Sequence, residues 1–359
     1  MTDLDTLLAL APYAMDKEEK HAFLTRELVA LSRRHREGSP EYARMLAAWG
    51  CDLDQVQSHR ELPFLPVRLF KEFSLSSVPQ EALHKTMTSS GTTGQQVSRI
   101  YLDRETSAAQ SKALSRIVSD FLGNSRLPMI ILDSSAVVSN RAMFSARGAG
   151  ILGFSFFARD KFYALDENMA LDVAGLRAFL EKHQGGPLFL FGFNFMVWQH
   201  FYRELLRLGE KPDLSQGILI HGGGWKKLAA EAVSPQQFKD ALREACGIAR
   251  VHDYYGMVEQ TGTIYMECEC GHLHAPVWSD VTIRNPVDFS PAPLGQKGLI
   301  QVSSLLPRSY PGHVLLTEDE GAALGEDDCP CGRKGKYFAV YGRIARAELR
   351  GCSDTYERT

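Results

Sequence analysis

The chain has 359 residues, 23% of them charged, and a formal net charge of −3 at pH 7. This length allows one large domain or two smaller ones, and a charge so near zero gives no sign of a nucleic-acid or membrane-surface partner. Asp3, Asp5 and Asp16 interrupt any signal-peptide pattern, and seven cysteines without such a signal favour a cytoplasmic protein with reduced thiols.

The chain begins with helices and then alternates strands with helices. Ser39 and Pro40 form a cap and a first-turn proline, Gly50 ends that helix, and Pro63 and Pro66 favour an extended connection. Helices are predicted further on over residues 103–122, 171–183, 195–208 and 234–246, and strands over 127–132, 188–191, 218–220 and 248–253. This alternation predicts an α/β fold, in which helices cover a mostly parallel sheet.

Beyond residue 275, short strands and Pro/Gly turns predict a smaller β-rich subdomain. The expected organisation is a helical N-terminal segment packed on the core over residues 1–85, an α/β core over 86–275, and the β-rich subdomain with a hinge-like C-terminal segment over 276–359. The most apolar run, residues 187–198, is too short to cross a bilayer.

Serines and threonines surround two glycines in residues 88–95. Such a segment is poorly suited to a strand or a helix, and its hydroxyl and free N–H groups suit phosphate oxygens. The candidate phosphate-binding residues are Ser89, Ser90, Gly91, Thr92, Thr93 and Gly94. A P-loop NTPase is disfavoured, because Gln95 stands where the Walker pattern has lysine. Taken alone, the segment is equally well explained as a Ser/Thr-rich surface turn.

Two other segments directly follow predicted strands: His221-Gly222-Gly223-Gly224 and Tyr254-Tyr255-Gly256. Ligands of open α/β sheets collect at the carboxyl ends of the strands. The α/β core is therefore expected to hold a nucleotide site.

The order of these motifs resembles that of the adenylate-forming enzymes, which make acyl-AMP from a carboxylic acid and ATP. The motifs concerned are the loop, Tyr255-Gly256-Met257-Val258-Glu259 and Thr317-Glu318-Asp319. Segments 221–226, 255–260, 341–343 and 350–354 resemble one branch in particular, the LuxE-type acyl-protein synthetases, or long-chain fatty acid–protein ligases. The resemblance implies the N-terminal-domain fold of adenylate-forming enzymes, with their large rotating C-terminal domain absent.

The resemblance also implies roles for individual residues. Glu259 matches the Mg²⁺ ligand, Tyr255 the residue that stacks on adenine, and Asp319 the ribose-binding aspartate. Arg343 matches a hinge arginine that also meets the ribose, and Gly222–Gly224 let the backbone approach the base edge. A solvent-facing glutamate and a buried core tyrosine are the alternatives for Glu259 and Tyr255.

The chain departs from the pattern of the adenylate-forming enzymes at two places. Their phosphate loop usually ends in a lysine, where this chain has Gln95 and Gln96, and Glu318 replaces a glycine of the third motif. Lys226 or Lys227 is the candidate for meeting the phosphate charge. A plain surface lysine is the alternative for either residue.

In LuxE-type proteins the second step moves the acyl group from AMP to a cysteine near the carboxyl end and then to a partner acyl reductase. Cys352 stands where that cysteine is expected, and Arg350 beside it would lower the pKa of its thiol. An inert cysteine is the alternative. The expected activity is ATP- and Mg²⁺-dependent activation of a fatty acid with transfer to Cys352. The alternatives are an acyl-CoA ligase resembling phenylacetate–CoA ligase and a non-catalytic binding module.

Four cysteines form two close pairs, which in a cytoplasmic protein favour a structural Zn²⁺ site over disulfides or free thiols. The candidate ligands are Cys268, Cys270, Cys329 and Cys331. His272 and His274 are candidates to replace one thiolate.

An apolar wall for the acid is offered by a run of large side chains that would serve equally well as core. These residues are Phe191, Phe193, Phe195, Met196 and Trp198.

Overall fold

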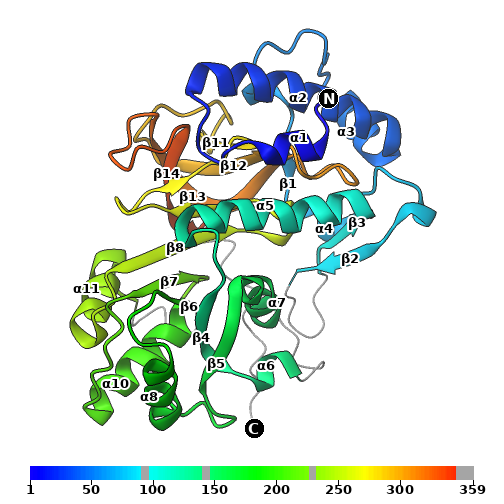
Figure 1. Ribbon diagram of the computed structural model, residues 1–359. Helices are drawn as coiled ribbons and strands as arrows, with labels where there is room; N and C mark the ends of the chain where they lie inside the picture. Colours follow the sequence, from blue (N-terminus) through cyan, green and yellow to red (C-terminus); the bar gives the residue numbers. More distant parts are fainter. Residues whose placement is uncertain (90–96, 140–145, 226–231, 345–359) are drawn as a thin grey trace. The chain divides into compact units, whose positions relative to one another are not determined.

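The computed structural model describes residues 1–89, 97–139, 146–225 and 232–344 (Figure 1). The chain divides into two compact units. Unit 2 is continuous, from Phe121 to Tyr254, whereas unit 1 combines Met1–Asp120 with the described residues from Tyr255 on. The predicted boundaries at residues 85 and 275 divide the chain by composition rather than by contact, and they remain a proposal.

Unit 2 is built on parallel strands in the order β8-β7-β6-β4-β5. Their bounds are β4 Leu127–Ser134, β5 Ala158–Leu165, β6 Leu188–Phe193, β7 Gly217–Gly222 and β8 Arg250–Gly256. Its helices are α6 Ala136–Ser139, α7 Ala146–Phe154, α8 Val173–Lys182, α9 Asn194–Met196, α10 Arg203–Leu208 and α11 Pro235–Cys246, with a 3-10 turn η4 Ser155–Phe157 and a π-helical segment η5 Val197–Tyr202. This arrangement confirms the predicted α/β fold.

The central strands of unit 2 are apolar on both faces because helices cover both faces. Successive residues of a strand point to opposite sides. Leu190 of β6 belongs to the core that includes Leu176 of α8, Leu205 of α10 and Phe238 of α11. The next residue, Phe191, instead stacks on Phe154 of α7, with ring centroids 4.4 Å apart.

Unit 1 contains antiparallel strands in the order β11-β12-β13-β14-β10-β9, with β1 added in parallel to β13. Their bounds are β1 Leu65–Pro66, β9 Ile264–Glu267, β10 Leu273–His274, β11 Ser279–Arg284, β12 Gly298–Ser304, β13 Val314–Glu326 and β14 Lys336–Arg343. A separate antiparallel pair joins β2 Lys85–Thr88 to β3 Arg99–Leu102. The β-rich character predicted for the C-terminal part is therefore confirmed.

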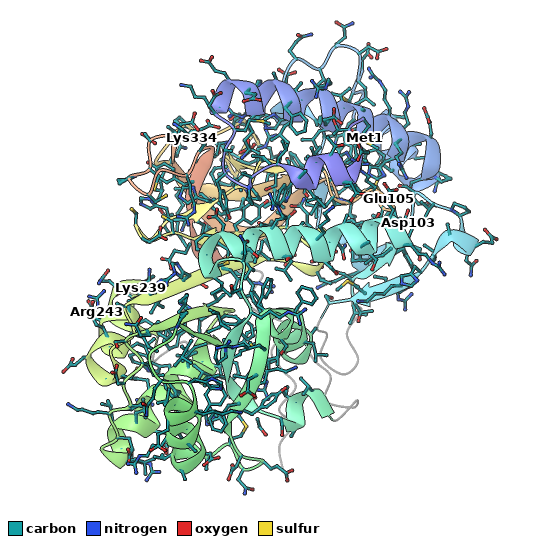
Figure 2. All side chains as sticks on the ribbon, viewed as in Figure 1. Met1, Asp103, Glu105, Lys239, Arg243 and Lys334 are labelled. Carbon is teal, nitrogen blue, oxygen red and sulfur yellow. The ribbon has the colours of Figure 1, made fainter. Side chains whose placement is uncertain are left out.

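The helices of unit 1 come mainly from the N-terminal part of the chain. They are α1 Leu4–Ala9, α2 Lys17–Gly38, α3 Pro40–Ala48, α4 Leu69–Glu72 and α5 Arg104–Leu122, with 3-10 turns η1 His59–Glu61, η2 Gln80–Ala82 and η7 Val258–Gln260. The predicted cap at Ser39 is confirmed, because its side chain accepts from the Tyr42 N–H. Asp103, labelled in Figure 2, accepts in the same way from the Thr106 N–H at the start of the helix predicted from residue 103.

Buried polar contacts hold the N-terminal helices on the strands of unit 1. His59 and Lys336 lie 2.9 and 2.8 Å from the same Asp280 carboxylate oxygen, and Lys20 of α2 donates to the Ala275 carbonyl. Burial raises the pKa of Asp280, but the charge of Lys336 and the hydrogen bond from His59 outweigh it and keep that pKa well below its usual range. Paired in this way, the buried charges are compatible with a folded interior.

Across the described ranges, no helix has the length and apolar character needed to span a bilayer.

Candidate functional site

The phosphate-loop segment is closed at its base by a pair of serines. The Ser89 N–H donates to the Ser98 carbonyl at 3.1 Å, and the Ser98 N–H donates to Ser89 Oγ at 2.9 Å. These bonds extend the β2–β3 ladder by one step and bring the ends of the loop together. The remaining candidates of the loop lie outside the described residues: Ser90, Gly91, Thr92, Thr93 and Gly94.

The Glu259 carboxyl group lies at the base of this loop. It is half-buried on η7, which packs against β3, and burial raises its pKa. The Ser98 hydroxyl and the positive charges of Lys71 and Arg343 oppose that shift. A carboxylate beside the Ser98 hydroxyl offers the kind of oxygen donors that Mg²⁺ takes in proteins.

Three residues singled out in distant parts of the sequence meet in unit 1. The Tyr255 hydroxyl donates to Asp319 Oδ2 at 2.7 Å, and Arg343 Nε lies 3.9 Å from Asp319 Oδ1. Asp319 on β13 and Arg343 on β14 are direct cross-strand partners. The Asp319 N–H also donates to Thr317 Oγ1 at 3.1 Å. The carboxylate is therefore oriented by two groups, the Tyr255 phenol and the Arg343 cation on the neighbouring strand.

The electrostatics of this group depend on its burial. Burial raises the pKa of Asp319, while the Tyr255 hydroxyl and Arg343 lower it and Glu318 raises it. Burial also raises the pKa of Tyr255 well above its usual value, so the phenol keeps its proton and remains a donor at neutral pH. Next to it, Gly256 is exposed, and a Cβ there would lie 3.0 Å from Ile264.

The segment His221–Gly224 lies at the carboxyl end of β7 in unit 2. Burial lowers the pKa of His221 to about 3, so the ring is neutral, and its Nδ1 lies 2.6 Å from Asn194 Oδ1. This short distance identifies Nδ1 as the protonated nitrogen that donates to the amide oxygen.

Packing accounts for two of the three glycines that follow His221. A Cβ on Gly222 would lie 2.5 Å from the Tyr254 ring, and Gly223 has φ +80° and faces Phe193 at 3.0 Å. Gly224 has open space around its Cβ position. Only Gly224 is therefore left without a packing reason for having no side chain.

The apolar residues considered for the acid divide between core and partly exposed positions. Phe191 and Met196 are fully buried in unit 2. Phe193, Phe195 and Trp198 are half-buried.

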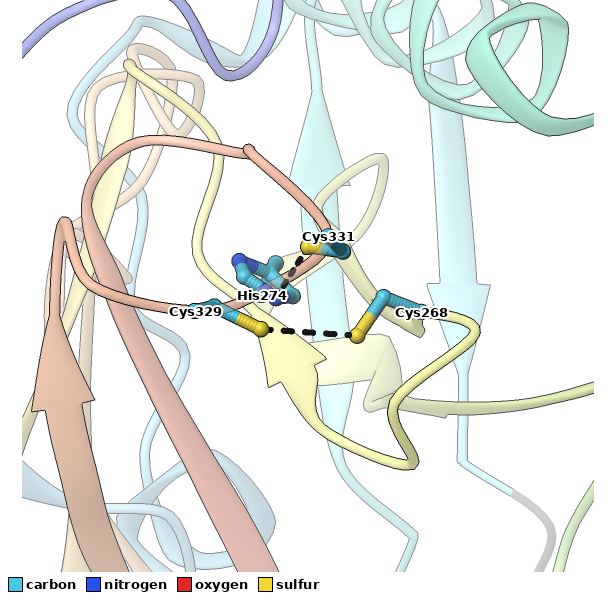
Figure 3. Close-up of side chains that lie close together, drawn as sticks. All are labelled: Cys268, His274, Cys329 and Cys331. Atoms are coloured by element: carbon cyan, nitrogen blue, oxygen red, sulfur yellow. Dashed lines mark hydrogen bonds between the residues drawn. The ribbon is translucent and has the colours of Figure 1, made fainter.

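A cluster of sulfur and nitrogen donors lies in unit 1, between the β9–β10 turn and the β13–β14 turn (Figure 3). The side-chain donor atoms of Cys268, His274, Cys329 and Cys331 all lie within 4.8 Å of one another. Cys268 Sγ is 3.8 Å from Cys329 Sγ, and Cys331 Sγ is 3.4 Å from His274 Nε2. Burial lowers the pKa of His274 to about 4, so its imidazole is neutral, as metal binding requires.

Cys270 is exposed and is not one of these four groups. Its backbone N–H donates to Cys268 Sγ at 3.4 Å, while its own side chain points elsewhere. His272 Nδ1 lies 3.3 Å from Cys329 Sγ.

The two Cys-x-Cys-Gly segments fold into matching turns. In one, the Gly271 N–H donates to the Cys268 carbonyl, and in the other the Gly332 N–H donates to the Cys329 carbonyl, both at 3.0 Å. Each glycine has a positive φ, +80° and +82°, which other residues adopt at a cost. The first cysteines of the two turns, Cys268 and Cys329, thereby come together with their sulfur atoms 3.8 Å apart.

The remaining candidates lie outside the described residues: Cys352 and Arg350 near the carboxyl end, and Lys226 and Lys227 after β7. Two residues at the site, Ser98 and Lys71, belong to none of the motifs predicted from the sequence. Ser98 is signalled only by its place opposite Ser89 across the hairpin. Lys71 belongs to no motif, and nothing in the local sequence distinguishes it from a surface lysine.

Comparison with known sequences identifies one family over the whole chain. The profile described as "Acyl-protein synthetase, LuxE" matches residues 2–359. Two similar proteins are each described as a long-chain-fatty-acid–luciferin-component ligase. The one from Vibrio harveyi is 21% identical over 361 residues, covering 98% of this chain and 92% of that protein. The one from Aliivibrio fischeri is 22% identical over 310 residues, covering 84% and 79%.

Comparison with solved structures supports the fold. An open conformation of 2-hydroxyisobutyryl-CoA ligase, solved with 2-HIB-AMP and CoA, matches with a TM-score of 0.71 and 18% sequence identity. The match covers 93% of this chain and 72% of that one. The fold is therefore that of an adenylate-forming ligase.

Proposed function

The chain belongs to the LuxE family of acyl-protein synthetases, and we propose that it activates a fatty acid with ATP and loads the acyl group onto its own Cys352. In the first step a carboxylate oxygen of the acid attacks the α-phosphorus of ATP. The bond to the β-phosphate breaks, which gives acyl-AMP and pyrophosphate. In the second step the Cys352 thiolate attacks the acyl carbon, and AMP leaves as the thioester forms.

The observation that most strongly supports the first step is the meeting of Tyr255, Asp319 and Arg343. An ionised Asp319 accepts hydrogen bonds from the ribose hydroxyls, and the face of the Tyr255 ring offers a platform for adenine. Because the Tyr255 hydroxyl and Arg343 already fix the carboxylate, little rearrangement is needed when the nucleotide binds.

The phosphates would bind at the loop closed by Ser89 and Ser98. Loop hydroxyl and N–H groups donate to the phosphate oxygens, and Glu259 would hold Mg²⁺ together with water molecules. When bound, this ion supplies positive charge to the phosphates and to the departing pyrophosphate. Glu259 must be ionised for that role, and the positive charges of Lys71 and Arg343 favour its ionised form.

The sulfur cluster is proposed to hold one structural Zn²⁺ through Cys268, His274, Cys329 and Cys331. Three thiolates and a neutral imidazole are a donor set that suits Zn²⁺ in a structural site, and the four of them would hold the ion without a water ligand. His272 then serves as a hydrogen-bond donor to the Cys329 sulfur. The ion would tie the β9–β10 turn to the β13–β14 turn and so stabilise the strands that carry Asp319 and Arg343.

Intact-mass spectrometry tests the proposed function. The protein is incubated with ATP, Mg²⁺ and a series of fatty acids of increasing length. We expect a mass increase equal to the acid less one water, which hydroxylamine removes because a thioester is cleaved by it. Neither an adduct nor pyrophosphate release with any acid would contradict the proposal. Release of acyl-CoA without an adduct, when CoA is added, would instead support a CoA ligase. Transfer of the acyl group from the adduct to an acyl reductase would identify that reductase as the partner.

A further inference from the structure

The phosphate loop of this chain carries less positive charge than its role requires. The triphosphate of ATP bears several negative charges, and enzymes that break it use cations to stabilise the departing phosphates. Gln95 and Gln96 follow the loop in place of a lysine. If the proposed function is right, another part of the chain must bring a cation to the β- and γ-phosphates.

The short helix α4 is anchored to both sides of the loop base. Phe70 packs its ring edge-to-face on Tyr310, with centroids 6.0 Å apart. Tyr310 and the Glu259 carbonyl both border Gly312, where a Cβ would lie 2.2 and 2.8 Å from them. On the other side, the Ser74 hydroxyl lies 3.2 Å from the Tyr101 hydroxyl on β3, the strand that leaves the loop.

Lys71 is the cation that α4 brings to this place. Its side chain is half-buried, and its ammonium enters no ion pair or hydrogen bond with the other residues that the structure describes, while its backbone N–H donates to the Arg68 carbonyl at 3.0 Å. Both α4 and η7, the turn that carries Glu259, pack against β3. The cation just before α4, Arg68, is instead paired with Glu72 at 3.2 Å. Lys71 is thus a half-buried lysine whose ammonium has no partner among the described residues, on a helix that packs against the same strand as the turn carrying Glu259.

A purely structural role for Lys71 would be to balance Glu259. Such a role needs a close pair, because an ion pair in partly exposed surroundings is weak unless its geometry is good. No such pair exists in the structure. A compact ammonium on a flexible stem is, by contrast, suited to a phosphate group that arrives with the ligand.

We propose that Lys71 binds the β- and γ-phosphates of ATP and takes the place of the lysine that the loop lacks. The proposal rests on the function proposed above. As the bond between the α- and β-phosphates breaks, the ammonium stabilises the charge that passes to pyrophosphate. Lys71 contributes little to the binding of AMP or acyl-AMP, because neither contains the β- and γ-phosphates.

The experiment compares Lys71→Met with Lys71→Arg and with a matched control, Lys85→Met. Lys85 is an exposed lysine at the far end of β2. Isothermal titration calorimetry with Mg²⁺ and without acid measures Kd for ATP and for AMP. We expect Lys71→Met to raise the Kd for ATP by at least about tenfold, as for a lost charged hydrogen bond. The Kd for AMP should be unchanged. Lys71→Arg should recover most of the ATP affinity, and Lys85→Met should match the wild type.

Two outcomes would overturn the assignment. One is an unchanged ATP affinity in Lys71→Met, and the other is an equal loss for ATP and AMP together with a lower melting temperature, which would mark a structural lysine. Failure of the proposed function is distinguishable, since the wild-type protein would then neither bind ATP nor release pyrophosphate with any acid. A wild-type protein that loads fatty acid, with a Lys71→Met variant that binds ATP normally, would remove only the role of Lys71.

Discussion

The Tyr255 hydroxyl donates a 2.7 Å hydrogen bond to Oδ2 of Asp319. The motif residue expected to stack on adenine therefore also orients the carboxylate expected to bind ribose. Oδ2 is engaged by the phenol, while Oδ1 lies 3.9 Å from Arg343. The roles of the Tyr255 ring and hydroxyl can be tested separately, because a phenylalanine at this position keeps the ring and lacks only the hydroxyl.

The variant Tyr255→Phe should weaken AMP binding by about threefold to tenfold, the range for one hydrogen bond. Its pH dependence should change as well. Asp319 accepts hydrogen bonds best when ionised, so AMP affinity is lost as pH falls through its pKa. The Tyr255 hydroxyl lowers that pKa, so its removal raises the pKa and moves the acid limb of the affinity profile to higher pH.

Calorimetric titration of AMP across a pH series measures both effects. Tyr265→Phe is the control, since the Tyr265 hydroxyl faces Gln260 rather than Asp319 and its loss should leave the profile in place. Coincident acid limbs for Tyr255→Phe and the wild type would show that the hydroxyl does not influence Asp319.

Glu259→Gln should lower the rate of acyl-AMP formation by at least about a hundredfold, because the substitution keeps the shape and removes the charge that would hold Mg²⁺. Acid-dependent exchange of labelled pyrophosphate into ATP measures this step. The difference in exchange rate between the variant and the wild type should shrink as the Mg²⁺ concentration rises. A variant with wild-type exchange would remove Glu259 from the metal site.

Cys352→Ala should keep pyrophosphate exchange and lose the covalent adduct, because the nucleophile acts only after acyl-AMP has formed. Cys51→Ala is the matched control, a half-buried cysteine far from any motif, and it should load normally. A hydroxylamine-sensitive adduct that persists in Cys352→Ala would assign the thioester to another cysteine.

The metal cluster predicts different effects for two cysteines of one segment. Cys268→Ser should release zinc and lower the melting temperature by at least about 5 °C, since it removes a buried ligand. Cys270→Ser should keep both the metal and the stability, because its side chain is exposed and outside the cluster. Elemental analysis of protein purified without chelator gives the metal content. Well under one equivalent of zinc in the wild type, or loss of zinc in Cys270→Ser, would contradict the proposed ligand set.

Features set by a few neighbouring residues were predictable from the sequence. Ser234 and Pro235 begin α11, and Gly247 ends it in the left-handed conformation at φ +79°, because caps and stops depend on local backbone groups. The parallel sheet of unit 2 followed from the alternation of apolar runs and helices.

Features that depend on long-range packing were not predictable. Spacing alone pairs Cys270 with Cys268, yet the turn that places Cys268 Sγ in the cluster directs the Cys270 side chain to solvent, and His274 comes in from β10. The role of Gly222 also depends on long-range packing. Its lack of a side chain leaves space for the Tyr254 ring, and no sequence motif indicates this contact. The helix α4, which carries Lys71, packs against the same strand as the Glu259 turn only in the folded chain, although Lys71 stands almost two hundred positions earlier than Glu259.

The way unit 1 is divided along the chain has a consequence for how the protein is made. β1 pairs with β13 through Leu65 and Leu315, and α2 is held by residues that follow Tyr255. At roughly 5–20 residues per second, the ribosome needs about 10 to 50 seconds to synthesise the stretch between those two leucines. Unit 2 is continuous and can fold within that time. The first helices are therefore complete long before the strands on which they pack have been made.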